Sequence, residues 1–296
     1  MVCSRWFACL LITVAVPAIG SERSSEEPVR KRDIVFKRIG DVRLKLHIYE
    51  PASVKPGDGR PAIVFFFGGG WRAGSPSQFE PHCRHLASLG MVAAAADYRV
   101  YGRHKTRAVK CVEDGKSAVR WMRAHAKELG IDAKRIAAGG GSAGGHVAAC
   151  TAVIRGFEGE GEDRSISSAP DALILFNPAL VLAPVDGESP FPADRMKSLG
   201  KRMGTEPSKL SPYHHVRQGL PPTIIFHGTA DKVVAFKTAK MFARAMKDQG
   251  NRCELRSYEG KGHGFFNYNR DRKAYDQTVK EMDTFLESMG WLPIDK

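Results

Sequence analysis

A serine enclosed by glycines is the residue of this chain best suited to covalent chemistry. Ser142 stands in Gly140-Gly141-Ser142-Ala143-Gly144, directly after an apolar run and directly before a segment with the composition of a helix. A sharp turn from strand to helix exposes such a serine, and only small residues fit two positions to either side of it. A phosphate-binding loop is the alternative, but the G-K-[ST] ending of that motif is missing. The pattern predicts a nucleophilic Ser142.

A serine of ordinary acidity needs a base, and the base needs an acid that orients it. Two later segments supply these groups. Asp231 ends His227-Gly228-Thr229-Ala230-Asp231 after the apolar run 223–226, and His263 lies in Gly260-Lys261-Gly262-His263-Gly264 after the run 253–258. The chain order Ser, Asp, His is that of the α/β-hydrolase fold and differs from the orders in chymotrypsin and subtilisin. We expect His263 to be the general base and Asp231 the orienting acid.

Three consecutive glycines could supply backbone N–H groups for a negatively charged oxygen. They follow the apolar run 62–67 in Phe67-Gly68-Gly69-Gly70-Trp71. Without side chains, such amides can approach an oxyanion closely. We expect Gly69 or Gly70 to form an oxyanion hole with the amide of Ala143. The alternative, that the glycines only make a tight turn, accounts for one or two of them.

Aromatic and histidine side chains near these segments are candidate substrate contacts, namely Trp71, His214, His215 and Phe265. The remaining histidines have simpler interpretations. His82 and His85 are spaced for one helix face but lack the Glu and the third ligand of a zinc site, so a solvated helix surface is expected. His146 is expected to pack or cap, and His227 to be a structural hydrogen-bonding residue. No metal site is predicted.

The elements that must position these residues follow an α/β pattern. Two alternating segments, 34–39 and 42–49, flank Gly40-Asp41 and predict an antiparallel hairpin. Helical segments separate most of the short apolar runs that follow, and these runs predict strands buried on both faces at 62–67, 91–96, 136–139, 172–176 and 223–226. A mostly parallel sheet with helices on both faces is therefore expected in a domain over 33–296. Residues 180–220, rich in proline and charge, predict a small lid or insertion.

The amino-terminal residues resemble an export signal. Arg5 precedes a mostly apolar stretch, and Ala18-Ile19-Gly20 places small residues where a signal peptidase cleaves. We expect a signal peptide at 1–20, cleavage before Ser21, a flexible leader at 21–32 and a periplasmic or extracellular protein. No later segment is apolar enough to span a membrane, so no stable membrane insertion is expected after the signal is removed.

Charge and cysteine content restrict the partners further. Lys and Arg number 45 against 32 Asp and Glu, a net charge of +13. The charges are scattered, and no nucleic-acid-binding motif is present, so no nucleic-acid partner is expected.

The four cysteines after the signal lie in helix or strand patterns and are expected to be free buried thiols, although their even number also permits disulfides: Cys83, Cys111, Cys150 and Cys253. The oligomeric state is left open.

Three motifs together resemble those of a known enzyme group. The segments 140–146, 227–231 and 262–265 are similar to those of α/β-hydrolase esterases of the acetyl-esterase and bacterial feruloyl-esterase-like group, related to the hormone-sensitive-lipase group. The resemblance implies an exported serine carboxylesterase without a cofactor, often acting on acyl groups attached to plant or algal polysaccharide. One residue departs from the pattern, since Phe67 stands where the family usually has a His that braces the glycine loop.

The resemblance and the residues lead to one expected function and two alternatives. We expect hydrolysis of short-chain, above all acetyl, esters through an acyl-serine intermediate, on a small-molecule or polysaccharide-borne ester. The basic charge would suit an acidic or sulfated glycan. An arylformamidase-like amidase is the first alternative, because Gly68-Gly69-x-Trp71 also resembles the loop of that family. A non-catalytic binding module is the second, although such modules usually lose a triad residue and none is lost here.

Overall fold

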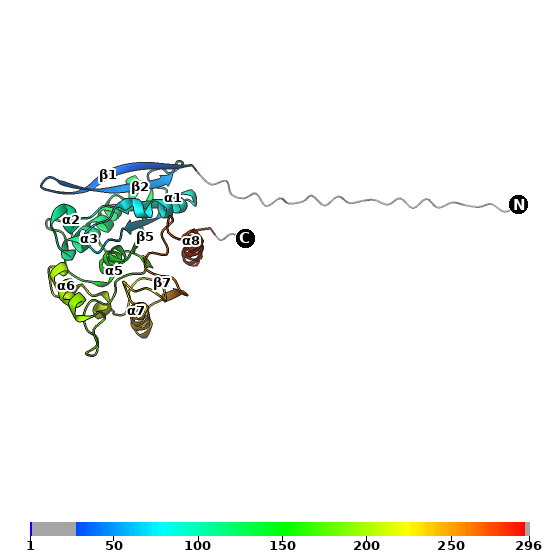
Figure 1. Cartoon of the computed structure of the whole chain (residues 1–296). Coiled ribbons are helices and arrows are strands. Elements are labelled where there is room, and N and C mark those ends of the chain that lie inside the picture. The colour runs from blue at the N-terminus through cyan, green and yellow to red at the C-terminus, as the bar shows by residue number, and fades with distance from the viewer. Residues whose placement is uncertain (2–27, 294–296) are drawn as a thin grey trace.

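The computed structural model describes Met1 and residues 28–293, and within these one sheet of eight strands forms the centre of the molecule (Figure 1). The strands run in the spatial order β1-β2-β4-β3-β5-β6-β7-β8. Their bounds are β1 Val29–Ile39, β2 Val42–Pro51, β3 Arg60–Phe66, β4 Val92–Ala96, β5 Ile131–Gly141, β6 Ala172–Phe176, β7 Thr223–Gly228 and β8 Cys253–Tyr258. Only β1 with β2 and β2 with β4 pair antiparallel. The predicted mostly parallel sheet with an amino-terminal hairpin is confirmed, because β3 to β8 pair with one another only in parallel.

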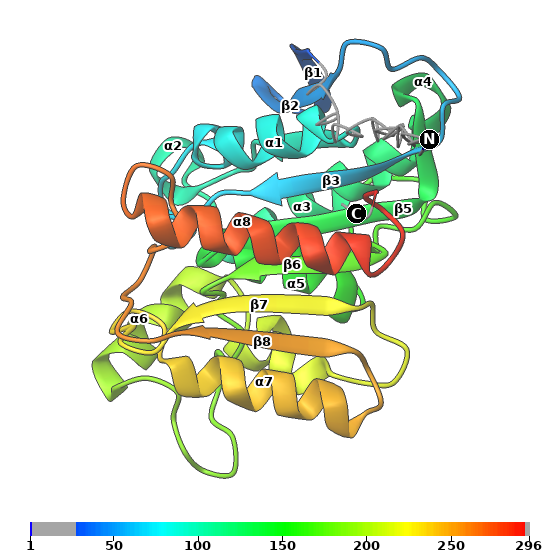
Figure 2. The ribbon, with the colours of Figure 1, turned by 90° about the vertical axis from the view of Figure 1, so that its right-hand side faces the viewer.

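Helices cover both faces of the sheet, as the alternation of strand and helix predicts (Figure 2). Residues of α1 and α8 pack with one set of strand side chains, and residues of α3, α5 and α7 pack with the other. The helices are α1 Glu80–Ser88, α2 Tyr101–His104, α3 Ala108–Ala124, α4 Ala126–Leu129, α5 Ala143–Val153, α6 Ala193–Met203, α7 Phe236–Asp248 and α8 Arg272–Glu287. The structure is thus the α/β-hydrolase fold that the sequence predicts.

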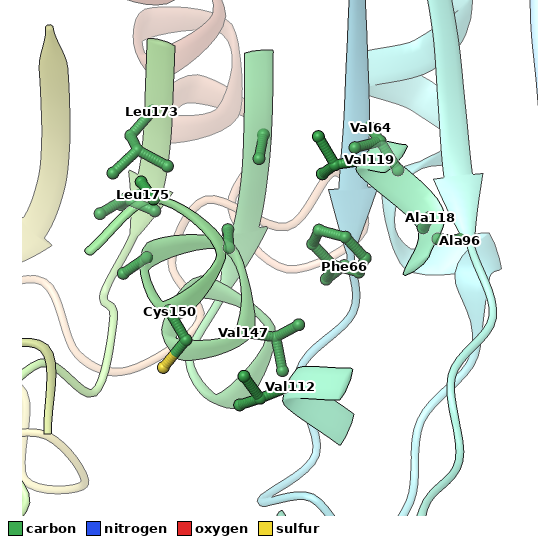
Figure 3. Close-up of a cluster of buried hydrophobic side chains, with 14 of the residues drawn as sticks. Val64, Phe66, Ala96, Val112, Ala118, Val119, Val147, Cys150, Leu173 and Leu175 are labelled. Carbon is green, nitrogen blue, oxygen red and sulfur yellow. The ribbon is translucent and has the colours of Figure 1, made fainter. Parts of the chain in front are cut away.

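The helix that follows Ser142 lies deep in this arrangement. Every residue of α5 is buried, and its side chains pack between the sheet and α3 (Figure 3). The labelled residues come from α5 (Val147 and Cys150), α3 (Val112, Ala118 and Val119) and three strands, namely β3 (Val64 and Phe66), β4 (Ala96) and β6 (Leu173 and Leu175). Because tight packing fixes both ends of the preceding turn, α5 is a rigid support for the nucleophile.

The amino-terminal boundary differs from the expected one. Strand β1 begins at Val29, so the last four residues of the leader expected at 21–32 belong to the sheet. The reason is a distant partner: Arg30 and Arg32 lie 2.7 and 3.0 Å from the buried carboxylate of Glu50 on β2. A buried charge needs such pairing, which draws polar residues into the strand. The signal peptide expected at 1–20 lies outside the described residues, apart from Met1.

The segment 180–220 connects β6 to β7 and contains α6 and two short 3-10 helices, Pro207–Leu210 and Pro212–His215. Its apolar side chains join the main core, among them Leu180, Leu182, Met203 and Leu210. Charged residues of α6 remain outside that core, including Arg195 and Arg202. The expected insertion is therefore a packed wall of the domain.

The cysteine prediction is confirmed for the described residues. Cys83, Cys111, Cys150 and Cys253 are buried and free. Burial raises the pKa of Cys111 above its ordinary value, so this thiol stays protonated and unreactive at neutral pH. Within residues 28–293, no helix is both long and apolar enough to cross a membrane.

Candidate active site

Ser142 occupies a strained turn between β5 and α5. Its backbone has φ 54° and ψ −116°, a conformation that residues with a side chain rarely adopt. The flanking glycines are required by close backbone contacts: a Cβ on Gly144 would lie 2.0 Å from the carbonyl oxygen of Phe66, and one on Gly140 would lie 2.6 Å from the backbone of Gly144. The predicted strand-turn-helix position of Ser142 is confirmed.

The structure brings the three predicted triad residues into one hydrogen-bonded chain. The Ser142 Oγ lies 2.9 Å from His263 Nε2, and His263 Nδ1 lies 2.8 Å from Asp231 Oδ2. The three residues follow β5, β7 and β8, whose carboxyl ends meet at the same edge of the sheet. This geometry suits a serine hydroxyl that donates to His263, which in turn donates from Nδ1 to the carboxylate.

Asp231 is held as a charged carboxylate. Its Oδ1 accepts hydrogen bonds from the amides of Val233 and Val234 at 2.8 and 2.9 Å. Burial acts to raise the pKa of Asp231, but hydrogen bonds from His227, from His263 and from the Val234 amide outweigh it, so the pKa lies well below its ordinary value. An ionised Asp231 keeps the proton of His263 on Nδ1, which leaves Nε2 free to act as a base.

His227 has the structural role that the sequence predicts. Its Nε2 lies 2.8 Å from the Val234 carbonyl oxygen and 3.3 Å from Asp231 Oδ2. Since both neighbours accept hydrogen bonds, Nε2 carries the proton, and the buried Nδ1 has no partner in the part of the chain that the structure describes. His227 therefore holds the Asp231 turn in place and does not contact Ser142.

The glycine loop presents its amides beside Ser142. A Cβ on Gly68 would lie 3.4 Å from the Ser142 Cβ, so the loop passes directly beside the nucleophile. The Gly68 amide donates to Gln78 Oε1 at 2.6 Å. Gly69 has φ 127°, and a Cβ there would lie 2.2 Å from the Ala73 carbonyl oxygen. With Gly68 engaged, the Gly69 and Gly70 amides are the loop donors that can join Ala143 at the first position of α5.

Tyr98 braces the glycine loop at Phe67, the position where the resemblance implies a histidine. The Phe67 ring stacks on Tyr98 with centroids 4.2 Å apart, and the Tyr98 hydroxyl donates to the Phe67 carbonyl oxygen at 2.6 Å. At the other end of the loop, Trp71 Nε1 donates to His146 Nδ1 at 3.1 Å. His146 is buried and its Nε2 contacts the Leu210 carbonyl oxygen at 2.7 Å, which confirms that it packs. The loop is thus fixed at both ends.

A cavity of about 710 Å³ opens over Ser142 and His263. Its apolar lining includes side chains of the insertion and of the loop after His263, namely Leu182, Phe191, Leu199 and Phe266. Its polar lining includes Gln78, Asn177, Arg195, Arg202, Asn267 and Arg270. The site is therefore a partly apolar cleft that also contains cationic side chains, from α6 and from the loop after His263.

The candidate substrate contacts have mixed outcomes. Trp71 lines the cavity as expected. Phe265 does not, because it packs on Tyr258 with ring centroids 4.7 Å apart, and its neighbour Phe266 lines the cavity instead. Gly264, between His263 and these rings, has φ 77°, so the backbone turns just before them.

His214 and His215 also lie outside the cavity lining. Their ring nitrogens contact groups of their own segment. His214 Nδ1 lies 2.8 Å from Ser211 Oγ, and His215 Nε2 lies 3.0 Å from the Ser208 carbonyl oxygen. These two histidines stabilise the insertion, and the expectation that they contact substrate is wrong for this cavity.

The expectation of a solvated helix surface at His82 is wrong as well. His82 is fully buried among Phe65, Phe79 and Tyr275, and neither ring nitrogen has a partner in the described chain. Burial, with a smaller effect of His85, lowers the pKa of His82 to about 3. Only His85 reaches the surface, where it contacts Asp283 at 2.7 Å. Since α1 packs on the sheet beside α8, a buried histidine and a partly exposed histidine lie three residues apart on this helix.

Two positioning residues escaped the sequence analysis. Asn177 Oδ1 accepts from the Gly264 amide at 2.8 Å and so fixes the loop of His263. Gln78, which holds Gly68, is itself held by Asn267 Oδ1 at 2.8 Å. Asn177 directly follows β6, and a polar residue at that strand end is a usable signal. Gln78 lies in a 3-10 turn, and its sequence carries no such signal.

Residues 28–293 contain no group of three or more His, Cys, Asp or Glu side chains placed to hold a metal ion. The chemistry that the geometry supports is acyl transfer through Ser142.

Comparisons with known proteins agree with this chemistry. The BD-FAE family matches residues 46–246, and the dienelactone hydrolase family matches residues 204–291. A probable isoprenylcysteine alpha-carbonyl methylesterase from Arabidopsis thaliana is 27% identical over 80% of this chain, which spans 51% of that protein. Carboxylesterase NlhH from Mycobacterium tuberculosis is also 27% identical, over 81% of this chain and 76% of the relative.

A solved structure gives a fuller match. Thermogutta terrifontis esterase 2, in a form phosphonylated by sarin, is 53% identical to this chain, with a TM-score of 0.87. The alignment covers 90% of this chain and 97% of the esterase. The chain therefore belongs to the BD-FAE family and is a carboxylic ester hydrolase of the α/β-hydrolase fold.

Proposed function

We propose that this enzyme is an exported esterase that removes short acyl groups through an acyl-serine intermediate. The observation that carries the proposal is the hydrogen-bonded chain from Asp231 through His263 to Ser142, beside amides that can receive an oxyanion. The short-acyl preference, the mechanism and the export are each open to a separate test.

In the proposed mechanism, Ser142 Oγ bonds to the ester carbonyl carbon while His263 Nε2 takes its proton. The carbonyl oxygen becomes negative and receives hydrogen bonds from Ala143 and from Gly69 or Gly70. The bond from carbon to the alcohol oxygen then breaks, and His263 gives its proton to the departing alcohol. Water, deprotonated by His263, attacks the acyl-serine and releases the acid, and the proton returns to Ser142. Asp231 stabilises the positive ring of His263 in both halves.

The short-acyl preference is supported by the structural neighbour. Two structures of Thermogutta terrifontis esterase 2 are described as propionate-bound and butyrate-bound. In the present chain, Leu182, Phe191 and Leu199 give the cavity an apolar wall against which a short alkyl group can pack. The resemblance to feruloyl-esterase-like enzymes supports a carbohydrate as the alcohol.

Hydrolysis of p-nitrophenyl acetate, butyrate and octanoate by wild type and Ser142→Ala tests the proposal. We expect turnover on acetate and butyrate, a steep decrease at octanoate and no enzymatic turnover in the variant. Octanoate as the best substrate would overturn the short-acyl preference. Equal turnover in wild type and Ser142→Ala would overturn the mechanism. The amidase and binding-module alternatives are not retained, because the relatives and the neighbour are esterases.

Export rests on residues 1–20 and is tested by expressing the full chain in a bacterium with a secretion pathway. We expect the protein outside the cytoplasm with an amino terminus at Ser21. A cytoplasmic protein that retains residues 1–20 would contradict this proposal without affecting the esterase mechanism.

A further inference from the structure

A second, smaller pocket of about 220 Å³ adjoins the active-site cavity. The two share Gly70 and Trp71 of the glycine loop and Arg202 of α6. We call the second one the basic side pocket, because Arg72, Arg107, Lys201 and Arg202 line it, together with Thr106 and Ser198. A group bound there lies directly beside the loop that faces the reacting carbonyl.

The cations of the basic side pocket have no carboxylate partners. No Asp or Glu lines the pocket, and none of its four cationic side chains forms an ion pair within residues 28–293. The guanidinium groups of Arg72 and Arg107 instead lie 5.5 and 5.7 Å from the Tyr101 ring. Like charges gathered without counter-charges raise a positive potential that attracts an anion.

Two buried polar atoms of the pocket have no hydrogen-bond partner among the residues that the structure describes. They are Arg202 Nε, a donor, and Thr106 Oγ1, a hydroxyl, and both residues line the pocket. Buried polar groups are nearly always satisfied in folded proteins, so an unsatisfied pair in one pocket calls for a missing partner. An anion accepts from both kinds of group. The Arg202 side chain also reaches the glycine loop, since a Cβ on Gly70 would lie 3.8 Å from Arg202 Nη1.

Arg195 extends the same positive surface into the active-site cavity. It lies two turns before Arg202 on α6, lines the cavity and has no ion pair in the described chain. Burial, followed by the positive charge of Arg202, lowers the pKa of Arg195. The repulsion between the two arginines is relieved when an anion lies near them.

We propose that the basic side pocket binds an anionic group, a carboxylate or a sulfate, carried by the ester substrate, so that the preferred substrate is an acyl ester of an anionic sugar. This inference rests on the proposed esterase function and adds the chemical class of the alcohol. Arg202 is the central contact, because it alone of the four cations lines both the cavity and the side pocket. Arginine matches carboxylate and sulfate oxygens with paired N–H donors.

The test compares three sugar esters: O-acetylated methyl glucuronoside with a free carboxylate, O-acetylated methyl glucoside, and its 6-sulfate. We expect wild type to show a higher kcat/KM on an anionic ester than on the neutral one by about tenfold or more, as one charge-assisted hydrogen bond provides. Added salt should shrink this ratio. A preference in only one anionic arm identifies the bound group as carboxylate or sulfate.

Variants test whether the preference for anionic esters arises in the basic side pocket. Arg202→Gln should reduce the anionic-to-neutral ratio about tenfold, and a ratio corrects for any general loss of activity. Arg72→Gln is the second variant, because its exposed side chain can be removed without disturbing the fold. Lys197→Gln is the matched control: it removes one charge from α6 at an exposed position outside both cavities and should keep the wild-type ratio.

The outcomes separate this inference from the esterase function. A wild-type ratio near one, with Ser142-dependent hydrolysis of the neutral ester, would overturn the inference and leave the esterase intact. A strong anion preference that both Arg202→Gln and Arg72→Gln retain would also overturn it. Absence of Ser142-dependent hydrolysis on the sugar esters and on p-nitrophenyl acetate alike would instead overturn the proposed function.

Discussion

The edge of the sheet that holds the triad and the insertion that faces it are built in opposite ways. At the triad, Asp231 and the Gly264 and Gly68 amides each have close hydrogen-bond partners. The carboxylate, the loop of His263 and the glycine loop are therefore each held in place. On α6, Arg195 and Arg202 line the same cavity, and neither forms an ion pair within residues 28–293. Catalysis needs polar groups that are already held in the reactive geometry, whereas polar groups without a partner in the protein are suited to binding a substrate. The contrast assigns chemistry to one wall and selectivity to the other.

Removal of the nucleophile is expected to have the largest effect on activity. Ser142→Ala should lower kcat on p-nitrophenyl butyrate by about 10⁴-fold to 10⁶-fold, because no acyl-serine can form. An unchanged melting temperature serves as the control for folding. A variant that keeps even a tenth of the wild-type rate would exclude Ser142 as the nucleophile.

Loss of the orienting charge comes next. Asp231→Asn should lower kcat by about 10⁴-fold, since the amide no longer holds the proton of His263 on Nδ1. Steady-state kinetics at neutral pH measure this effect. His227→Gln is the comparison variant: it removes the neighbouring ring from the same carboxylate and should cost far less activity. Equal losses in the two variants would contradict the assignment of His263 as the base.

An intermediate effect is expected at Asn177, whose side chain holds the loop of His263. Asn177→Ala should lower kcat by about 10-fold to 100-fold with a smaller change in KM, because the loop then loosens by a fraction of an ångström. Asn251→Ala is a matched control. Asn251 is a buried asparagine that binds the Leu220 amide and the Arg217 carbonyl away from the site. The Asn251→Ala variant should lower the stability of the protein but leave kcat unchanged. Equal losses of kcat in the two variants would contradict a positioning role for Asn177.

A smaller effect on kcat is expected when Tyr98, which braces the glycine loop, is changed. Tyr98→Phe removes the hydrogen bond to the Phe67 carbonyl but keeps the stacked rings. We expect kcat to decrease about twofold to tenfold and the free energy of unfolding to decrease by about 1 kcal/mol. Denaturant unfolding measures the latter. An unchanged kcat with the expected loss of stability would show that the ring stack alone places the loop.

The smallest expected effect is a pH dependence of stability. The pKa of Asp231 is lowered on folding, so its charged form stabilises the native state above its ordinary pKa of 3.8. That contribution disappears as the pH falls through the lower, folded-state value. The difference in melting temperature between wild type and Asp231→Asn should therefore stay constant from about pH 8 to about pH 5 and shrink below about pH 4. A difference that already changes near pH 6 would assign the titration to another group.

The same contrast explains how much could be predicted from the sequence. The triad and the glycine loop follow strands within a few residues, so local motifs were enough to find Ser142, Asp231 and His263. Positions set by tertiary packing could not be found in this way. Phe265 packs on Tyr258, and its neighbour Phe266 lines the cavity instead. His82 became buried because α1 packs against the sheet, and β1 began at Val29 because Arg30 and Arg32 neutralise the buried Glu50.

The insertion shows the same limit more clearly. Its composition predicted a separate segment, but nothing local distinguished Arg202, which faces the cavity, from Lys197 on the same helix, which does not. His214 and His215 were attractive because of their chemistry, yet their partners belong to their own segment. Which polar residue of an irregular segment reaches a site depends on contacts far apart in the chain.

The central claim is that one serine, activated by His263 and Asp231, carries the acyl group. It is tested most directly by reaction with paraoxon followed by peptide mass spectrometry, a reagent with which Thermogutta terrifontis esterase 2 is described as phosphorylated. We predict one phosphoryl group per chain, located on Ser142, and a loss of esterase activity in proportion to labelling. Labelling of a different residue, or full activity in a chain labelled at Ser142, would contradict the account.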